Sequence, residues 1–205
     1  MALVKYNNNS LSAITSTGLS AGAMTLIKEQ TASSSATISF VHGTSDVVLD
    51  STYPIYVFKF INIHPATDNV NFSVGFRDGS TDYDATKTTT FFNAQHKEDD
   101  SHTSLAYDQY GDLAQSTAFQ VLQWNMGADN DQSCSGTLHL YNPSSTTYVK
   151  NFMFRGSRVH RDDYAIDEFV SGYCNVTAAI DGVQFKFSSG NIDAGTFKLY
   201  GIKDS

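Results

Sequence analysis

Acidic side chains are the first candidates for chemistry in this sequence. The densest group, which follows the segment TYVKNFMFRGSRV, consists of Asp162, Asp163, Asp167 and Glu168. Two carboxyl groups at a fixed separation can hydrolyse a glycosidic bond, one as an acid and the other as a base or nucleophile. Runs of Asp are also common in solvated loops, and the sequence sets no separation for these groups. The pattern favours a solvated acidic loop and leaves a polysaccharide-cleaving enzyme as a third functional hypothesis.

Two further clusters contain residue types that bind metals. His96 and His102 flank the acidic run KEDDS, but a metal site needs imidazoles that are aimed from a fixed backbone. The segment ADNDQ, residues 128–132, alternates Asp and Asn as calcium loops do, without the Gly and the distal Glu of an EF-hand. We therefore predict no metal site, with a loose calcium site in ADNDQ as the alternative.

Motifs for cofactors and nucleophilic catalysis are missing from the sequence. GLSAG, residues 18–22, has the letters of G-x-S-x-G, but it neither follows a core strand nor opens a helix. The sequence has no P-loop, HExxH or dinucleotide-binding fingerprint. Cys134 and Cys174 lack a CxxC spacing, and we expect two unpaired thiols inside strands. We predict no catalytic residue and no cofactor.

Tyrosines in or near predicted turns are candidate contacts for a sugar, because sandwich lectins stack sugars on such rings. The alternative is that Tyr suits β-rich surfaces and interfaces in general. The single tryptophan, Trp124, argues against a carbohydrate-binding module. The candidate glycan contacts are Tyr107, Tyr110, Tyr148 and Tyr164.

Composition limits both the fold and the partners. The chain has 205 residues, of which only 17% are charged, and it is rich in Thr, Val, Phe and Tyr, which favours strands over helices. A formal net charge of −8 with 13 scattered Lys and Arg argues against nucleic acid as a partner. The sequence has neither the apolar run of a transmembrane helix nor the apolar core of a signal peptide. We expect cytoplasmic synthesis and no membrane insertion.

Alternation of apolar and polar residues predicts about ten antiparallel strands. Phe185 and Phe187 come before a Gly- and Asn-containing turn, and Phe197 and Leu199 follow it, which predicts a closing hairpin. Similar patterns predict a hairpin around Pro65 and an opening hairpin between MTLIKE and TISFVH. The fold class is predicted to be all-β, with one antiparallel β-sandwich of jelly-roll type over residues 31–205.

The first 30 residues differ from the rest of the chain. They are small, polar and dotted with Gly, so they cannot form a core of their own. A flexible leader is one interpretation. We favour an extended arm that attaches the protein to a neighbouring subunit or a larger assembly, through the spaced apolar residues Leu3, Leu11, Ile14 and Leu19.

Three segments carry a resemblance to a known group of proteins. They are FKFINIHPATDNVNFSVGF, GTLHLYNPSSTTYVKNFMFRG and GVQFKFSSGNIDAGTFKLYGIK. The chain resembles virion structural proteins of tailed bacteriophages, especially phages of marine bacteria and cyanobacteria, over about residues 50–205. In that group a strand that ends in YNPSS, an F-x-F-SSGN turn and a terminal G-T-x-x-LYG strand recur together. The resemblance is structural and implies no catalytic residues.

The resemblance implies a non-enzymatic protein on the surface of the virion, either a capsid decoration or a tail fibre or appendage. Its partners would be other virion proteins, and a homotrimer is the first expectation because repeated parts form symmetric oligomers. The alternative function is a carbohydrate-binding module that recognises host surface glycans. Fold alone does not decide between them.

Overall fold

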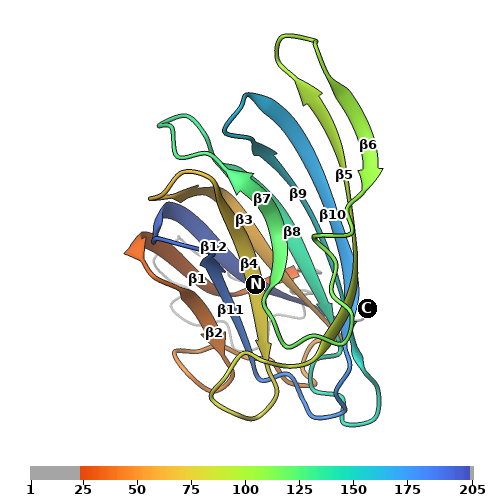
Figure 1. The fold of residues 1–205 in the computed structure, drawn as a ribbon. Helices are drawn as coiled ribbons and strands as arrows, with labels where there is room; N and C mark the ends of the chain where they lie inside the picture. Colours follow the sequence, from red (N-terminus) through yellow and green to blue (C-terminus); the bar gives the residue numbers. More distant parts are fainter. Residues whose placement is uncertain (1–23, 204–205) are drawn as a thin grey trace, which may run out of the picture.

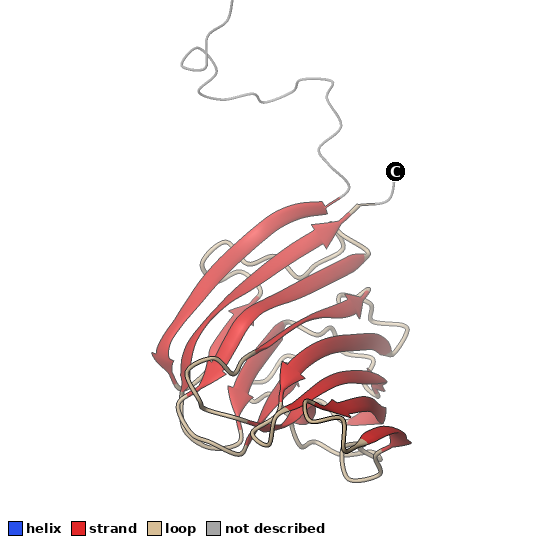
Figure 2. Ribbon diagram, turned by 90° about the horizontal axis from the view of Figure 1, so that it is seen from above, coloured by secondary structure: helices blue, strands red, loops and turns tan. Residues whose placement is uncertain are grey.

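The computed structural model describes residues 24–203, which contain twelve β-strands and no helix (Figures 1 and 2). The predicted all-β antiparallel sandwich is therefore confirmed. The strands are β1 (Met24–Ser35), β2 (Ile38–Val41), β3 (Ile55–Pro65), β4 (Val70–Arg77), β5 (Lys87–Lys97), β6 (Thr103–Tyr107), β7 (Gln120–Met126), β8 (Cys134–Tyr141), β9 (Lys150–Val159), β10 (Tyr164–Cys174), β11 (Gly182–Phe187) and β12 (Ile192–Ile202).

Strand pairing follows a jelly-roll pattern. One sheet has the order β1-β12-β3-β8-β9-β10-β5-β6, and the other has the order β2-β11-β4-β7. The first four strands therefore pair in reverse order with later ones: β1 with β12, β2 with β11, β3 with β8, and β4 with β7. A long antiparallel ribbon wrapped in this way gives the two Greek keys of a jelly roll.

Two hairpins are inserted into this eight-strand framework. Strands β5 and β6 come between β4 and β7 in the chain, and β9 and β10 come between β8 and β11. All four inserted strands add to the β8 edge of the larger sheet, and the β5–β6 hairpin ends the sheet (Figure 1). The larger sheet therefore extends beyond the smaller sheet that covers its framework strands.

The prediction that neighbouring strands pair with each other in three hairpins is wrong. Strands β11 and β12 belong to different sheets, as do β3 and β4 around Pro65, and β1 and β2 at the start of the described chain. Each of these connections joins a strand of one sheet to a strand of the other sheet. Alternation of apolar residues identifies the buried face of a strand, but two strands with buried faces can pair side by side or pack face to face.

Most of the segment predicted to be an arm, residues 1–23, lies outside the described part of the chain. Strand β1 starts at Met24 and pairs with β12, so the last residues of the segment expected to be an arm belong to the sandwich. Leu3, Leu11, Ile14 and Leu19 lie outside the described residues.

A cluster of phenylalanine rings fills the space between the sheets. The Phe185 ring on β11 has its centroid 4.9 Å from that of Phe60 on β3 and 5.5 Å from that of Phe58. Phe72 on β4 lies 5.9 Å from Phe185, and all four rings are buried. Edge and offset ring contacts of this kind add to the free energy gained from burying apolar surface.

Both cysteines lie in the interior, as predicted. Cys134 on β8 and Cys174 on β10 are free and buried. Burial raises the pKa of the Cys134 thiol and raises that of Cys174 to about 12, so both thiols are protonated at neutral pH. In residues 24–203, no helix is long and apolar enough to cross a membrane.

Truncation of Phe185 tests the central position of this ring. Phe185→Ala leaves a cavity between the sheets and is expected to lower the free energy of unfolding by about 3–5 kcal/mol. Phe92→Ala is the matched control, because Phe92 is 39% exposed. Equilibrium urea unfolding measures both changes. Equal losses in the two variants would contradict the role assigned to Phe185.

Candidate functional site

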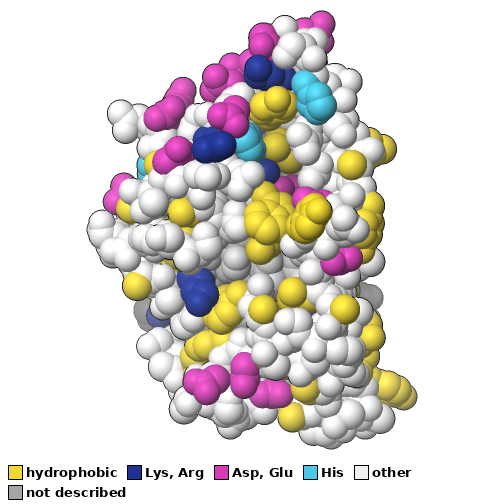
Figure 3. Space-filling model, in the orientation of Figure 1, with side chains coloured by type: hydrophobic (Ala, Val, Ile, Leu, Met, Phe, Trp, Pro, Cys, Tyr) yellow, Lys and Arg dark blue, Asp and Glu magenta, His cyan; other side chains and the backbone are white. Residues whose placement is uncertain are grey.

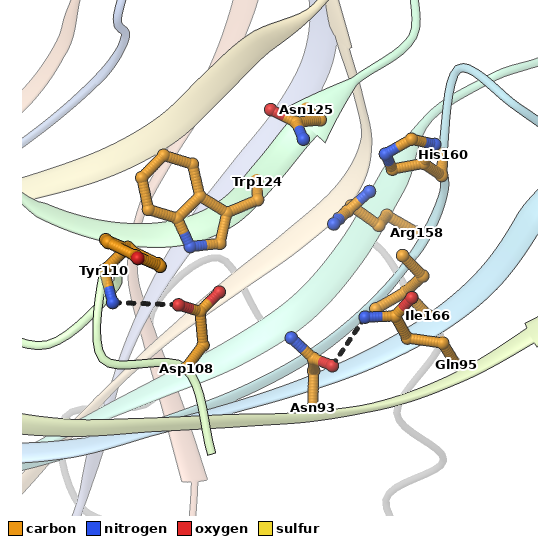
Figure 4. A pocket seen from close by; sticks show the side chains of 9 residues that line it. All are labelled: Asn93, Gln95, Asp108, Tyr110, Trp124, Asn125, Arg158, His160 and Ile166. Atoms are coloured by element: carbon orange, nitrogen blue, oxygen red, sulfur yellow. Dashed lines mark hydrogen bonds between the residues drawn. The ribbon is translucent and has the colours of Figure 1, made fainter. Parts of the chain in front are cut away.

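A cavity of about 340 Å³ opens beside β7, where the inserted strands extend past the smaller sheet (Figure 4). Trp124 and Asn125 of β7 lie on one side, and Arg158 of β9 and Ile166 of β10 lie on the other. The volume is at the lower end of the range of roughly 300–1,000 Å³ that is typical of small-molecule sites.

A buried ion pair forms the base of this site. Arg158 Nη2 donates to Glu168 Oε1 at 3.0 Å and Arg158 Nε donates to Oε2 at 3.4 Å. The two side chains are 3% and 0% exposed. The backbone N–H of Trp124 also donates to Glu168 Oε1, at 3.3 Å. Burial raises the pKa of Glu168 to about 7, against the opposing effect of the Arg158 charge.

Several buried polar atoms next to this pair have no partner among the described residues. They are Arg158 Nη1, Trp124 Nε1, and both Nε2 and Oε1 of Gln123. Gln123 precedes Trp124 on β7 and is fully buried. Most buried polar groups in proteins are hydrogen-bonded, so a local concentration of unpaired ones needs an explanation.

Polar side chains of β5 and of the turn after β6 also line the cavity in fixed positions. Gln95 Nε2 donates to Asn93 Oδ1 at 2.8 Å, so the two amides of β5 orient each other. Asp108 follows β6, and its Oδ1 accepts the backbone N–H of Tyr110 at 2.9 Å. This turn places the carboxylate inside the cavity and the Tyr110 ring at its rim, where the residue is 81% exposed.

His160 completes the lining at the end of β9. Its Nδ1 accepts the backbone N–H of Asp162 at 3.0 Å, so the neutral ring carries its proton on Nε2. Burial and the nearby positive charge of Arg158 lower the pKa of His160. The imidazole therefore contributes a neutral donor at physiological pH.

The predicted glycan contacts are only partly brought together. Tyr110 lines the main cavity, and Tyr107 and Tyr110 line an adjoining hollow with Asn93 and Gln95. Tyr164 lines a third hollow next to Arg158. Tyr148 precedes β9, at the end of that strand opposite Arg158, and is 71% exposed.

The acidic group of the sequence is divided between different surfaces. Asp167 and Glu168 are neighbours on β10 and point to opposite faces: Asp167 pairs with the exposed Arg155 at 2.7 Å, whereas Glu168 pairs with Arg158 inside. Asp162 and Asp163 lie in the turn between β9 and β10, beside Glu98 and Asp99 of the β5–β6 turn. Acidic side chains gather at this end of the molecule (Figure 3).

The candidate metal ligands also lie in exposed positions. His96 Nε2 is 3.0 Å from Asp100 Oδ1, and both side chains are more than half exposed. His102 belongs to the turn that joins β5 to β6. Throughout the part of the chain that the structure describes, no group of three or more His, Cys, Asp or Glu side chains could hold a metal ion.

A second buried polar row crosses the inner face of the inserted strands. Cys174 on β10 lies directly opposite Lys87 on β5 and Lys150 on β9, and both lysines are fully buried. Lys87 Nζ donates to the carbonyl of Ala85 at 2.5 Å, and Lys150 Nζ donates to that of Val176 at 3.0 Å. Burial lowers the pKa of both lysines. The row is closed to solvent and holds the inserted strands to the adjacent loops.

Comparison with known proteins gives no match. No protein-family model, curated protein or solved structure is significantly similar to this chain.

Most residues of the cavity could not be identified from the sequence. Trp124, whose status as the only tryptophan argues against a carbohydrate-binding module, lies in the cavity wall. Arg158 could be identified from the sequence as an inward-facing charged residue. It follows Phe152, Phe154 and Gly156 at every second position of an alternating strand. A charged residue at an inward-facing position of a strand indicates a buried partner.

The contribution of the buried pair of Arg158 with Glu168 to stability can be tested by substitution. Glu168→Leu leaves the buried Arg158 guanidinium without its carboxyl acceptors and is expected to lower the free energy of unfolding by about 3–5 kcal/mol. Asp167→Asn is the matched control one residue away, because it breaks an exposed pair worth less than about 1 kcal/mol. Urea unfolding followed by the fluorescence of Trp124 measures both. The double change Arg158→Met with Glu168→Leu should cost less than Glu168→Leu alone, and a larger cost would contradict this account.

Proposed function

We propose that this protein is a non-enzymatic structural component displayed on the surface of a bacteriophage particle, as a capsid decoration or a tail fibre or appendage. The supporting observation is where the virion-like segments fall. FKFINIHPATDNVNFSVGF spans the β3–β4 connection, GVQFKFSSGNIDAGTFKLYGIK spans β11 and β12, and GTLHLYNPSSTTYVKNFMFRG covers most of β8 and of β9. The resemblance therefore lies mainly on the jelly-roll framework, an architecture common in viral capsid and lectin domains.

The proposed partners are other virion proteins and further copies of the chain, with a homotrimer as the first expectation. The outer face of the larger sheet supports self-association. Met153 on β9 is 52% exposed and Leu26 on β1 is 48% exposed. Register places them in one row across the sheet, through His139, Val57 and Tyr200. The proposed location is the virion, after synthesis in the host cytoplasm.

The copy number of the chain in purified particles tests the virion role. Quantitative mass spectrometry against the major capsid protein of the phage that encodes the chain is the measurement. We expect the chain in every preparation: at a level comparable to the capsid protein if it decorates the shell, and at a small fraction of it if it belongs to the tail. Absence from washed particles would overturn the proposal.

A carbohydrate-binding module for host surface glycans is the second candidate. The cavity beside β7 favours it, because the exposed ring of Tyr110 and the indole of Trp124 flank fixed amide and carboxylate groups. Lectins also use the jelly-roll fold. The two functions are compatible, since a particle-surface protein is well placed to contact the host.

A glycan array built from host surface polysaccharides tests this second function. We expect binding by the wild type and a clear loss in Tyr110→Ala, because that ring borders the cavity. Tyr148→Ala is the control, since Tyr148 is similarly exposed at a distant loop. Both variants should unfold at the wild-type temperature. Equal binding by Tyr110→Ala and the wild type, or no binding by any of the three, would count against the module.

A further inference from the structure

The unpaired donors beside β7 face one space. Figure 4 shows the guanidinium end of Arg158 turned toward the middle of the cavity and the indole N–H edge of Trp124 facing the side of Asp108. Arg158 Nη1 and Trp124 Nε1 have no hydrogen-bond partner in residues 24–203. A buried donor without a partner costs roughly 1–3 kcal/mol, so a ligand oxygen that reaches these atoms recovers free energy on binding.

Acceptors line the same space. Asp108 uses Oδ1 to hold the backbone of Tyr110, which leaves Oδ2 for a ligand. Gln95 uses Nε2 to bind Asn93, which leaves Gln95 Oε1 as an acceptor and the Asn93 amide as a donor. A hydroxyl group both donates and accepts, and it is the ligand group that such a mixed wall satisfies best.

The aromatic side chains in the cavity suit the apolar face of a sugar ring. Trp124 and Tyr110 lie together on one side of the cavity, across from Arg158 and His160 (Figure 4). A pyranose has faces of apolar C–H groups and an edge of hydroxyls, so one ring can contact aromatic carbon and polar side chains at once. The volume of about 340 Å³ fits a single ring better than an oligosaccharide.

The charged side chains around the cavity disfavour an acidic ligand. The positive charge of Arg158 is paired with Glu168, and Asp108 adds a carboxylate to the wall. A carboxylate or phosphate in the cavity would meet the Asp108 carboxylate, and Arg158, the cation in the wall, is already hydrogen-bonded to the Glu168 carboxyl group. His160 also lines the cavity, and its lowered pKa keeps the imidazole neutral.

We infer that the cavity between Trp124 and Arg158 binds one uncharged pyranose ring of a saccharide. This inference rests on the second proposed function, glycan binding, and adds to it the site and the ligand class. Asp108 accepts from ring hydroxyls, Arg158 and Trp124 donate to ring oxygens, and Tyr110 covers the ring at the rim.

Saturation-transfer NMR with free sugars tests the inference. The probes are glucose, galactose, mannose and N-acetylglucosamine as neutral sugars, and glucuronic acid and sialic acid as acidic ones. We expect signals from at least one neutral sugar at about 1 mM affinity or tighter, and weaker or no signals from the acids. Binding should quench or shift the fluorescence of Trp124, the only tryptophan in the chain.

Asp108→Asn is the decisive variant. An Asn at this position still accepts the Tyr110 N–H but loses the negative charge, so neutral sugars should bind roughly threefold to tenfold more weakly and the discrimination against acidic sugars should shrink. Asp46→Asn is the matched control, because Asp46 is exposed in the loop after β2 and its positive φ of 66° suits Asn.

The outcomes separate this inference from the proposed functions. Preference for acidic sugars, or binding unchanged in Asp108→Asn, would overturn the neutral-ring site even if the glycan array is positive. No signal from any sugar, with a negative array, would overturn glycan binding as a whole. Neither result changes the copy number in particles, so the virion role is judged separately.

Discussion

The two sheets must bury their aromatic faces against each other, and the rest of the structure depends on this contact. Phe185 lies at the centre, in contact with rings from β3 and β4. Its partners come from segments far apart in the sequence, so no local piece of the chain can bury its apolar face alone. The framework strands are therefore held in register by side chains of the opposite sheet as well as by their ladder bonds.

The inserted strands take part in that contact only in part, through rings such as Phe152 of β9, which packs against Phe76 of β4. The smaller sheet ends at β7, and the inner face of β9, β10 and β5 includes the buried polar side chains Lys87, Lys150 and the pair of Arg158 with Glu168 among its apolar residues. Buried charges of this kind cost more to desolvate than apolar side chains of similar size. The buried pair of Arg158 with Glu168 lies where the smaller sheet ends at β7. The cavity forms at this place, and its wall already contains oriented polar groups.

Much of the fold could be predicted from the sequence, and much of the site could not. Alternation in segments such as VQFKF identifies strands and their buried faces, because side-chain direction has a period of two. It does not identify the partner strand, so β11 was paired with β12 instead of facing it across the core. The cavity joins Asn93, Asp108, Trp124 and Arg158 from four separate segments, and only their long-range pairing brings them together.

The pairing of β1 with β12 has a consequence for how the chain is made. The N-terminal strand of the framework has no partner in its own sheet until the last strand has been synthesised, and β2 waits in the same way for β11. Folds dominated by such distant pairings close slowly and expose unpaired strand edges in the meantime. The sandwich can therefore close only after β12 has been synthesised, and β1 and β2 are the segments most open to pairing with another nascent copy in the meantime.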